Sequence, residues 1–421
     1  MIVQPPAVLV RMGLVKPGVM WKLNKALYGL RCAPKRWGEK RDAMLKEARC
    51  SVGDIEATFE QCETAKGIWK IKSGNRIVGY FMVYVDDVLI HAPTKWVQAV
   101  MNTFESLWEC KLVGIIVGDG ETTVLAVNEL VFLSITIEPV TGGYALHQHE
   151  YVRTKLAKRA VTKGRAGLPE VDEGSVCPVT TEYKQTNEYK DLLNSAQQEV
   201  GSLQWLALKT RPDIACITAI CASMQSRNPQ KALDITVEIW KYILATKDCV
   251  ILLVPNSEAE NNIRISADAS FAPGGDRSRT GVVIKVQDAI VHWSSTKQSL
   301  ASTSAHEAEL NGVVTGTKLG IGIRSIAAEL LEVNQTMKLD QDNMATIRTI
   351  THEVTSWRTR HYALRAAWIR DIIKDERIRV EHEKGVEICA DPLTKVLGKV
   401  KLQEALDKLD ITKISQQTMS S

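Results

Sequence analysis

The chain has 421 residues, of which 45% are hydrophobic and 24% charged, and its formal net charge is +4. This length suits two or three domains, and the composition excludes a disordered chain. So mild a positive charge neither requires nor excludes a nucleic-acid partner. No apolar run approaches the roughly 18 residues of a membrane span, and the N-terminus lacks the pattern of a signal peptide.

The nine cysteines show no CxxC pair and no zinc-type Cys/His spacing. This pattern predicts cysteines that are reduced and buried in an intracellular protein. We therefore expect a location in a cytoplasmic particle or in the nucleus, and no secretion.

The first third of the chain predicts strands and helices in alternation. Residues 20–48 indicate a basic helical segment broken by Gly29 and Pro34. Residues 76–91 predict two strands around an acidic turn, and residues 95–108 an amphipathic helix. A strand over 130–137 leads through Thr141-Gly142-Gly143 into a hairpin.

The middle of the chain predicts a linker followed by helices. Residues 160–186 are rich in glycine, proline and charge, which favours a linker. A helical block follows over about 188–247, and Arg211-Pro212 is a plausible helix start because proline is favoured at the first helical position.

From about residue 262 the pattern becomes β-β-β-α-β-α-α-β-α, which predicts an α/β (α+β) domain with a mixed sheet and flanking helices. The strands are expected near 263–268, 281–286, 289–294, 336–340 and 377–382. The helices are expected near 305–319, 342–351, 359–374 and 390–408.

Asp86 and Asp87 lie between two apolar β-forming runs. Adjacent carboxylates are costly to bury, and a bound metal would relieve that cost. The alternative is an exposed turn with the two acids at its tip. The long apolar flanks favour the metal site.

Four further acids each follow or open an apolar segment: Asp268, Glu307, Asp342 and Asp391. Carboxylates brought together repel one another, and bound divalent cations offset the repulsion. Such a quartet suits phosphodiester hydrolysis by two metal ions. Each acid also has an ordinary alternative, because Glu307 fits a capping box with Ser304, and the two later aspartates fit helix N-caps.

His382 precedes Asp391 by nine residues, so it is a candidate proton shuttle for a metal site, with a surface histidine on an edge strand as the alternative. Basic residues among aromatic ones predict contacts with nucleic acid, and the alternative is a solvated helix face. The predicted nucleic-acid contacts are Lys25, Arg31, Lys35, Arg36, Arg358, Arg360 and His361.

Several segments in order resemble the C-terminal part of a Ty1/copia-type retrotransposon Pol polyprotein. WKLNKALYGLRCAPKRW and YFMVYVDDVLI resemble its reverse transcriptase, and FLSITIEPVTGGYALHQHEYV and EVGSLQWLALKTRPDIA resemble its following segments. DASFAPGGDRSRTGVVI, HWSSTKQSLASTSAHEAEL, DQDNMATI, SWRTRHYALRAAWIRD and ICADPLTK resemble its ribonuclease H domain. Ser134 stands where the family has glycine.

The resemblance implies a reverse-transcriptase palm and connection region followed by an RNase H-like domain. It implies that Asp86 and Asp87 belong to the polymerase metal site, and that the four later acids bind Mg²⁺ or Mn²⁺. It further implies RNA–DNA hybrid, RNA template and DNA as partners. The family's other catalytic aspartate lies upstream of the segment that MIVQPP resembles, so we expect a truncated palm with impaired polymerase activity.

The leading hypothesis is therefore a Pol fragment with hybrid-specific ribonuclease H activity. The alternative is a non-catalytic nucleic-acid-binding remnant of a decayed element. The expected regions are a partial reverse transcriptase over 1–160, a linker and helical connection over 161–255, an RNase H-like domain over 256–410 and a tail over 411–421.

Overall fold

A computed structural model describes residues 2–27, 29–118, 123, 125–174, 176–256, 258–259, 263–352, 362–375 and 377–413. The chain forms two compact units, Met1–Leu125 and Ala126–Ser421, hereafter unit 1 and unit 2. This division lies earlier than the expected end of the first region at 160. The reason is strand pairing, because the hairpin that follows residue 130 hydrogen-bonds to a strand near residue 250.

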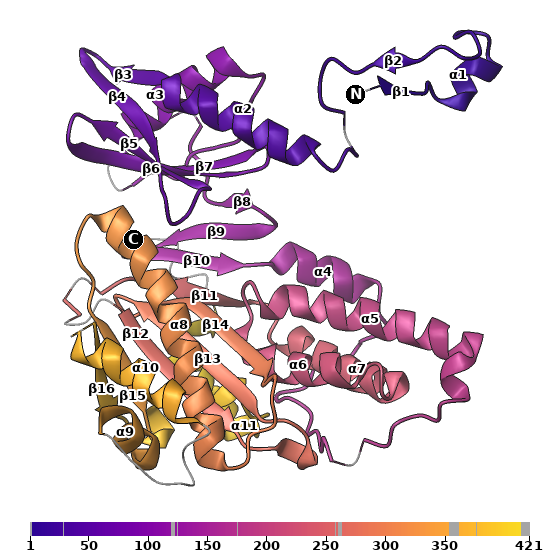
Figure 1. The fold of residues 1–421 in the computed structure, drawn as a ribbon, viewed down its shortest axis with the longest axis vertical. Helices are drawn as coiled ribbons and strands as arrows, with labels where there is room; N and C mark the ends of the chain where they lie inside the picture. The colour runs from indigo at the N-terminus through magenta and orange to yellow at the C-terminus, as the bar shows by residue number, and fades with distance from the viewer. Residues whose placement is uncertain are drawn as a thin grey trace. The chain divides into compact units, whose positions relative to one another are not determined.

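Unit 1 is an antiparallel meander of five strands with two main helices, drawn in violet in Figure 1. The strands are β3 (Arg49–Val52), β4 (Ile55–Gln61), β5 (Ile68–Ser73), β6 (Arg76–Tyr84) and β7 (Asp87–His91), and the helices are α2 (Ala33–Glu47) and α3 (Thr94–Leu107). A short pair, β1 (Ile2–Val3) and β2 (Trp21–Lys22), flanks α1 (Ala7–Arg11).

The strand–turn–strand over 76–91 and the helix near 95–108 are confirmed. The basic helix differs from the expectation, because Pro34 lies in the first turn of α2 instead of breaking a longer helix. Proline is tolerated in the first turn, where its missing N–H has no intrahelical partner. The core of unit 1 joins Leu45 of α2 and Phe104 of α3 to sheet residues such as Trp69 and Phe81.

Unit 2 begins with an antiparallel sheet in the order β17-β11-β10-β9-β8 and a group of helices. The strands are β8 (Leu130–Phe132), β9 (Ile135–Val140), β10 (Gly143–His147), β11 (Cys249–Leu253) and β17 (Ile411–Lys413). The helices are α4 (His149–Ala157), α5 (Asn187–Ala207), α6 (Ala215–Met224) and α7 (Pro229–Ala245), with short helical turns at η1 (Tyr183–Gln185) and η2 (Pro212–Ile214).

Two details of this sheet correct the expectations. The strand expected over 130–137 is interrupted by a turn at Leu133 and Ser134, whose φ angles of 50° and 64° are both positive. Two positive φ angles match the twist of a tight hairpin, which explains why the resembled family has glycine there. Residues 411–413, expected in a tail, form β17 and pair with β11.

The second sheet of unit 2 confirms the expected mixed α/β architecture. Its order is β14-β13-β12-β15-β16, with β12, β15 and β16 parallel to one another and β13 and β14 antiparallel. The strands are β12 (Ile263–Ser270), β13 (Arg279–Val286), β14 (Ala289–Lys297), β15 (Met337–Gln341) and β16 (Ile378–His382). The helices are α8 (Ala305–Leu331), α9 (Met344–Thr351), α10 (Ala363–Lys374) and α11 (Lys399–Lys408), with turns at η3 (Pro273–Gly275), η5 (Gly385–Glu387) and η6 (Asp391–Leu393).

Helix α8 is longer than expected, and the helix expected over 390–408 consists of the short turn η6 and the separate helix α11. Helix α8 crosses one face of the sheet in Figure 1 and contributes Leu310 and Val313 to a core with Ile265 of β12. A second core, built largely from α5, α6 and α7, includes Val283 of β13 and Leu393 of η6. The sheet is thus packed on both faces.

Cysteine burial is only partly as expected. All nine cysteines have free thiols, but Cys110 and Cys177 are exposed and Cys32 is half-buried. Among the described residues, no helix is both long and apolar enough to cross a membrane.

Gly281 of β13 permits η6 to lie against the sheet. A Cβ at this position would meet the Ala390 carbonyl oxygen and the Leu393 Cβ, each at 2.8 Å. Because a backbone oxygen cannot rotate away, η6 itself would have to move. Gly322 of α8 offers the opposite case, since nothing lies within 4 Å of a Cβ there.

We predict that Gly281→Ala destabilises the protein by about 1–3 kcal/mol, as overpacking usually does. Gly322→Ala should instead stabilise it by about 0.5–1 kcal/mol, because alanine is the better helix former. Urea unfolding followed by circular dichroism measures both values. Equal effects of the two substitutions would contradict the close packing of η6 on β13.

Candidate active site

Three carboxylates of unit 2 lie together at one edge of the mixed sheet. Oxygens of Asp268, Glu309 and Asp342 all lie within 4.8 Å of one another. Asp268 is near the C-terminal end of β12, and Asp342 directly follows the parallel strand β15. Parallel neighbours end at the same edge, so both aspartates reach one place. Glu309 reaches it from the start of α8, whose N-cap Ser304 accepts a hydrogen bond from the Glu307 N–H.

The Glu309 carboxyl is the most perturbed member of this group. Burial and the charges of Asp268 and Asp342 together raise its pKa to about 8, against a hydrogen bond from the Ala269 backbone and the charge of Lys395, which lower it. Its Oε2 is buried and has no hydrogen-bond partner within the described part of the chain. A carboxylate in this position favours a proton or a cation.

Asp268 is held by η6 and the residues that follow it. Burial raises its pKa, while Lys395 and a hydrogen bond from Thr394 lower it, and the nearby charges of Asp391 and Asp342 raise it. The Lys395 Nζ lies 2.6 Å from Asp391 Oδ1 and 3.8 Å from Asp268 Oδ2. Asp391 therefore stands beside the three-carboxylate group, with a lysine shared between it and Asp268.

Glu307, one of the four expected metal ligands, lies outside the three-carboxylate group. Its Oε2 accepts hydrogen bonds from the Thr303 N–H at 2.8 Å and the Thr303 hydroxyl at 2.9 Å, and its Oε1 lies 3.4 Å from Arg365 Nη1. The acid that joins Asp268 and Asp342 is Glu309, which sequence reasoning missed. The signal was present, because an acid at the third position of a capping box is engaged by that cap.

His382 lies at the exposed C-terminal end of β16, the edge strand of the mixed sheet. Its register partner on β15 is Gln341, the residue before Asp342. The structure thus places His382 at the same edge of the sheet as the carboxylates, in an exposed position.

A second group of potential metal ligands consists of Glu129, Glu138 and His147. Glu138 is on β9 and His147 on the neighbouring strand β10, and Glu129 directly precedes β8. The His147 Nε2 lies 2.9 Å from Glu138 Oε1, and His147 Nδ1 accepts the His149 N–H at 3.3 Å. An imidazole that accepts at Nδ1 carries its proton on Nε2, so Nε2 donates to Glu138. In this tautomer, His147 and Glu138 form a hydrogen-bonded pair.

Asp86 and Asp87 lie at the turn between β6 and β7. Both are exposed, and neither belongs to a group of three potential metal ligands among the described residues. The turn has Val85 at a φ of 55°, a rare conformation for a β-branched residue. The Val85 carbonyl accepts hydrogen bonds from Trp37 Nε1 and Arg41 Nη1 of α2, both at 3.3 Å.

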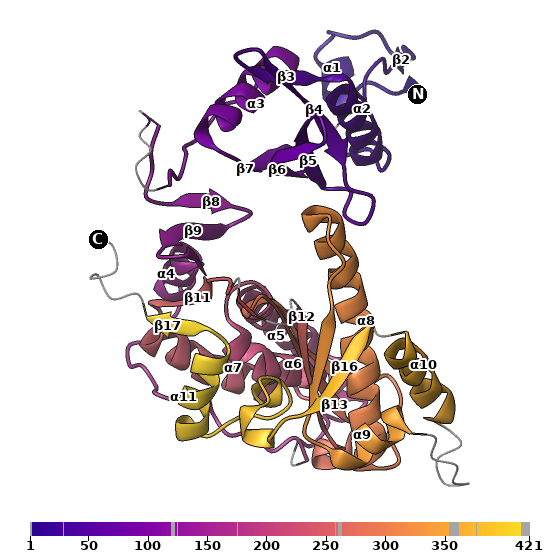
Figure 2. The ribbon, with the colours of Figure 1, turned by 90° about the vertical axis from the view of Figure 1, so that its left-hand side faces the viewer.

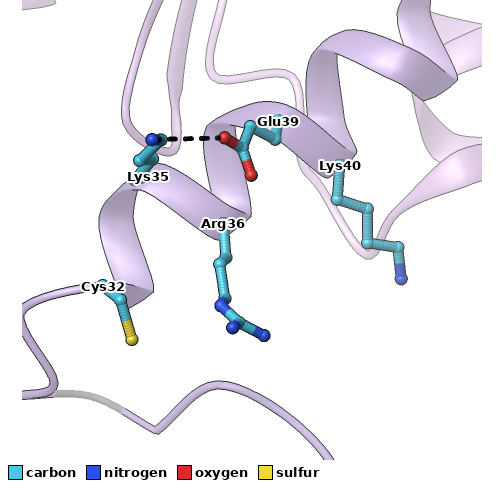
Figure 3. Close-up of a pocket in the computed structure, with 5 residues that line it drawn as sticks. All are labelled: Cys32, Lys35, Arg36, Glu39 and Lys40. Carbon is cyan, nitrogen blue, oxygen red and sulfur yellow. Dashed lines mark ion pairs between the residues drawn. The ribbon is translucent and has the colours of Figure 1, made fainter.

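The predicted nucleic-acid contacts of unit 1 are exposed: Lys25, Arg31, Lys35 and Arg36. The last two line an open surface depression of about 660 Å³ with Cys32, Glu39 and Lys40. Lys35 pairs with Glu39 at 3.9 Å, and Figure 3 shows Arg36 and Lys40 pointing away from α2 without such a pairing between the residues drawn. Arg358, Arg360 and His361 lie outside the described residues.

We predict that Glu309→Gln stabilises the metal-free protein increasingly as pH rises from 4.5 to 8. A carboxyl whose pKa is raised by folding binds more protons in the native than in the unfolded state over this window, so its contribution to stability is lost as pH rises. Glutamine is neutral in both states. Because a tenfold change in proton affinity corresponds to about 1.4 kcal/mol, the difference should reach a few kcal/mol near pH 8.

Thermal unfolding with EDTA at pH 4.5, 6 and 8 measures this difference. Added Mg²⁺ should reverse it if the wild-type carboxylates bind the ion. A difference that stays constant with pH would contradict the raised pKa of Glu309.

Comparisons with known proteins find a reverse-transcriptase family and several retrotransposon Pol polyproteins. Residues 1–168 match the family model "Reverse transcriptase (RNA-dependent DNA polymerase)". The chain is 27% identical over 412 residues to the retrovirus-related Pol polyprotein from transposon RE1 of Arabidopsis thaliana, covering 95% of this chain and 25% of that protein. It is 26% identical to the corresponding polyprotein from transposon TNT 1-94 of Nicotiana tabacum, covering 92% and 28%. It is 22% identical to the Ty1-DR5 Gag-Pol polyprotein of Saccharomyces cerevisiae, covering 89% and 21%.

Two solved structures are more distantly similar. The compost-derived LC11-RNase H1 is 19% identical with a TM-score of 0.26, covering 35% of this chain and 97% of that chain. The foamy viral protease-reverse transcriptase is 12% identical with a TM-score of 0.38, covering 72% and 46%. The chain spans about a quarter of the length of the curated relatives named above. Over most of its length, the chain is therefore similar to Ty1/copia-type retrotransposon Pol polyproteins, and residues 1–168 match the reverse-transcriptase family.

Proposed function

We propose that unit 2 is a ribonuclease H, which hydrolyses the RNA strand of an RNA–DNA hybrid with the help of divalent cations. The observation that carries the proposal is the meeting of Asp268, Glu309 and Asp342 within 4.8 Å, with Asp391 beside them. These four acids come from separate segments of the chain, so the fold itself brings them together.

The residues present fit a hard divalent cation such as Mg²⁺ or Mn²⁺. The three closest groups offer only oxygen donors, which these ions prefer. The buried, unpartnered Oε2 of Glu309 is one such donor, and burial together with the charges of Asp268 and Asp342 raises the pKa of this carboxyl. Asp268, Glu309, Asp342 and Asp391 would hold the ions. Bound ions would supply activation of a water molecule and stabilisation of the leaving 3′-oxygen.

The surrounding residues would orient this chemistry. Thr394 and Lys395 fix the Asp268 carboxylate, so its direction is set before substrate arrives. His382, exposed at the same edge of the sheet, would transfer a proton to or from solvent. The 2′-hydroxyl of RNA and the shape of the groove would distinguish a hybrid from duplex DNA.

We predict that Glu309→Gln and Asp342→Asn each lower Mg²⁺-dependent cleavage of a labelled RNA–DNA hybrid by about a thousandfold or more, because each removes a ligand of the ions. Glu307→Gln should leave measurable cleavage, since Glu307 lies outside the group. Gel analysis of the labelled RNA measures the products, and duplex DNA serves as the uncut substrate. Full activity of Glu309→Gln would overturn the proposal.

A non-catalytic nucleic-acid-binding remnant is the second candidate. The observation that favours it is Lys395, whose ammonium group lies against both Asp268 and Asp391 and competes with a metal for them. This candidate requires hybrid binding that weakens with salt and no turnover by well-folded protein. The same cleavage assay therefore decides between the two candidates.

We predict no primer extension by this chain alone. Asp86 and Asp87 are proposed as the remainder of a polymerase metal site, and within the described residues no third potential ligand joins them. Two exposed carboxylates on one turn hold divalent cations weakly. Extension of a labelled DNA primer on an RNA template measures the activity, and Asp86→Asn/Asp87→Asn controls for contaminants. Extension that this double variant loses would contradict the prediction.

A further inference from the structure

The start of α8 is a junction between the three-carboxylate group and two other helices. Figure 2 shows α9 and α10 beside α8. Glu309 faces the carboxylate group, while the ring nitrogens of His306 lie 3.3 Å and 3.2 Å from the hydroxyls of Thr346 and Thr349 on α9. Glu307 and Asn311 face α10, where Arg365 contacts both.

Arg365 binds the α10-facing side of this junction with a single nitrogen. Its Nη1 donates to Asn311 Oδ1 at 2.8 Å and lies 3.4 Å from Glu307 Oε1. The Glu307 side chain is 8% exposed and that of Arg365 is 34% exposed. The other Glu307 oxygen holds the Thr303 N–H and hydroxyl, so the carboxylate joins α10 to the loop before α8.

Asn311 extends the same contacts to the sheet. Its Nδ2 donates to Gln298 Oε1 and to Ser302 Oγ, both at 3.2 Å. The Gln298 Nε2 in turn donates to Thr280 Oγ1 at 2.9 Å and to the Ala308 carbonyl at 3.0 Å. Thr280 pairs with Ala269, the residue after Asp268. The hydrogen bonds thus run from α10 through α8 to the strands at the site.

Helix geometry explains how a contact on one side of α8 affects the other side. Each residue turns an α-helix by about 100°, so Glu307 and Glu309 point in nearly opposite directions. Glu307 and Asn311 are four residues apart and share one side. Fixing that side therefore fixes how far the Glu309 carboxylate reaches toward Asp268 and Asp342, against their mutual repulsion.

We propose that Arg365 is a positioning residue, which acts through Glu307 and Asn311 to hold Glu309 in the metal-binding arrangement. The expected effect of Arg365 on hybrid cleavage rests on the proposed function. Its expected effect on metal affinity is independent of cleavage, because it is measured on the protein without nucleic acid. The proposal also assigns Glu307 a role as the partner of Arg365 in place of a metal ligand.

The chain offers a matched control on the same helix. Arg370 of α10 donates from Nη1 to the carbonyls of Thr349 and His352, at 2.7 Å and 3.3 Å. It links α10 to α9 and makes no hydrogen bond to α8 among the described residues. Arg370→Gln removes the same charge from α10 and leaves the α8 contacts intact.

The first experiment is calorimetric titration of the full chain with Mn²⁺ in the absence of nucleic acid. Arg365→Gln should weaken Mn²⁺ binding by roughly tenfold, as loss of a group that orients a ligand typically does. Arg370→Gln should change it by less than about twofold, and Arg365→Lys should restore part of the affinity. Thermal unfolding of each variant shows whether it is folded.

A double substitution tests the path through Glu307. If Arg365 acts through this carboxylate, Glu307→Gln should weaken Mn²⁺ binding about as much as Arg365→Gln, and the double variant should be no weaker than either. Additive losses would contradict the proposed path. Equal Mn²⁺ affinities for Arg365→Gln, Arg370→Gln and wild type would overturn the proposal, as would a wild-type protein that binds no Mn²⁺.

The kinetics of RNA–DNA hybrid cleavage distinguish a positioning role of Arg365 from direct contact between Arg365 and the substrate. A positioning role predicts a lower kcat with an unchanged KM for hybrid in Arg365→Gln. A phosphate contact would instead raise KM and reduce the salt dependence of binding, and this outcome would overturn the proposal. If the wild type binds Mn²⁺ in an Arg365-dependent manner but cuts no hybrid, the positioning role stands and the ribonuclease H proposal fails.

Discussion

The structure of unit 2 is organised around one electrostatic constraint, the crowding of carboxylates at an edge of the mixed sheet. Asp268, Glu309 and Asp342 come within 4.8 Å of one another, and two of them are buried. Desolvation and mutual repulsion both oppose ionisation there, and the raised pKa values of Asp268 and Glu309 express that cost. The surrounding contacts hold these groups against separation.

Each neighbour of the carboxylates has a defined part in meeting this constraint. Thr394 and Lys395 supply a hydroxyl and a positive charge to Asp268 from the segment that follows η6. Gly281 lets that segment lie close to the sheet. The polar contacts of Arg365 and Asn311 anchor the start of α8 from its opposite side. The site is thus assembled from contacts made by η6, β13, α8 and α10 together.

The helices on the other face of the sheet contain a buried ionic contact of their own. Arg211 and Asp213 are almost fully buried and form a two-bond pair at 2.9 Å and 2.7 Å, and Tyr242 donates to the same carboxylate at 2.8 Å. Arg211 also donates to the Thr246 hydroxyl and carbonyl at the end of α7. A buried ion pair whose hydrogen bonds are satisfied fixes geometry more than it adds stability. It links η2 to α7 within the second core.

Much of the fold was predictable because the hydrophobic patterns of this chain are strong. The five strands of the mixed sheet follow short apolar runs, and the turn at Asp86 and Asp87 lies between two such runs. The interruption at Leu133 and Ser134 was not predictable from apolar pattern, because the turn itself carries an apolar residue. The helix expected near 305–319 continues to Leu331, and the glycines of α8 face the sheet or open space.

The candidate site was predictable in its segments but not in every residue. Asp268 and Asp342 follow from strands that end at one edge, whereas choosing between Glu307 and Glu309 requires the rotation of α8 about its axis. The capping box already provides that rotation, because Ser304 fixes the N-cap and the acid three residues later folds back over the cap. The acid two residues beyond must then point away from the cap. In this chain the Glu309 side chain therefore points toward Asp268. The capping box thus explains both why Glu307 is engaged by the cap and why Glu309 joins the carboxylate group.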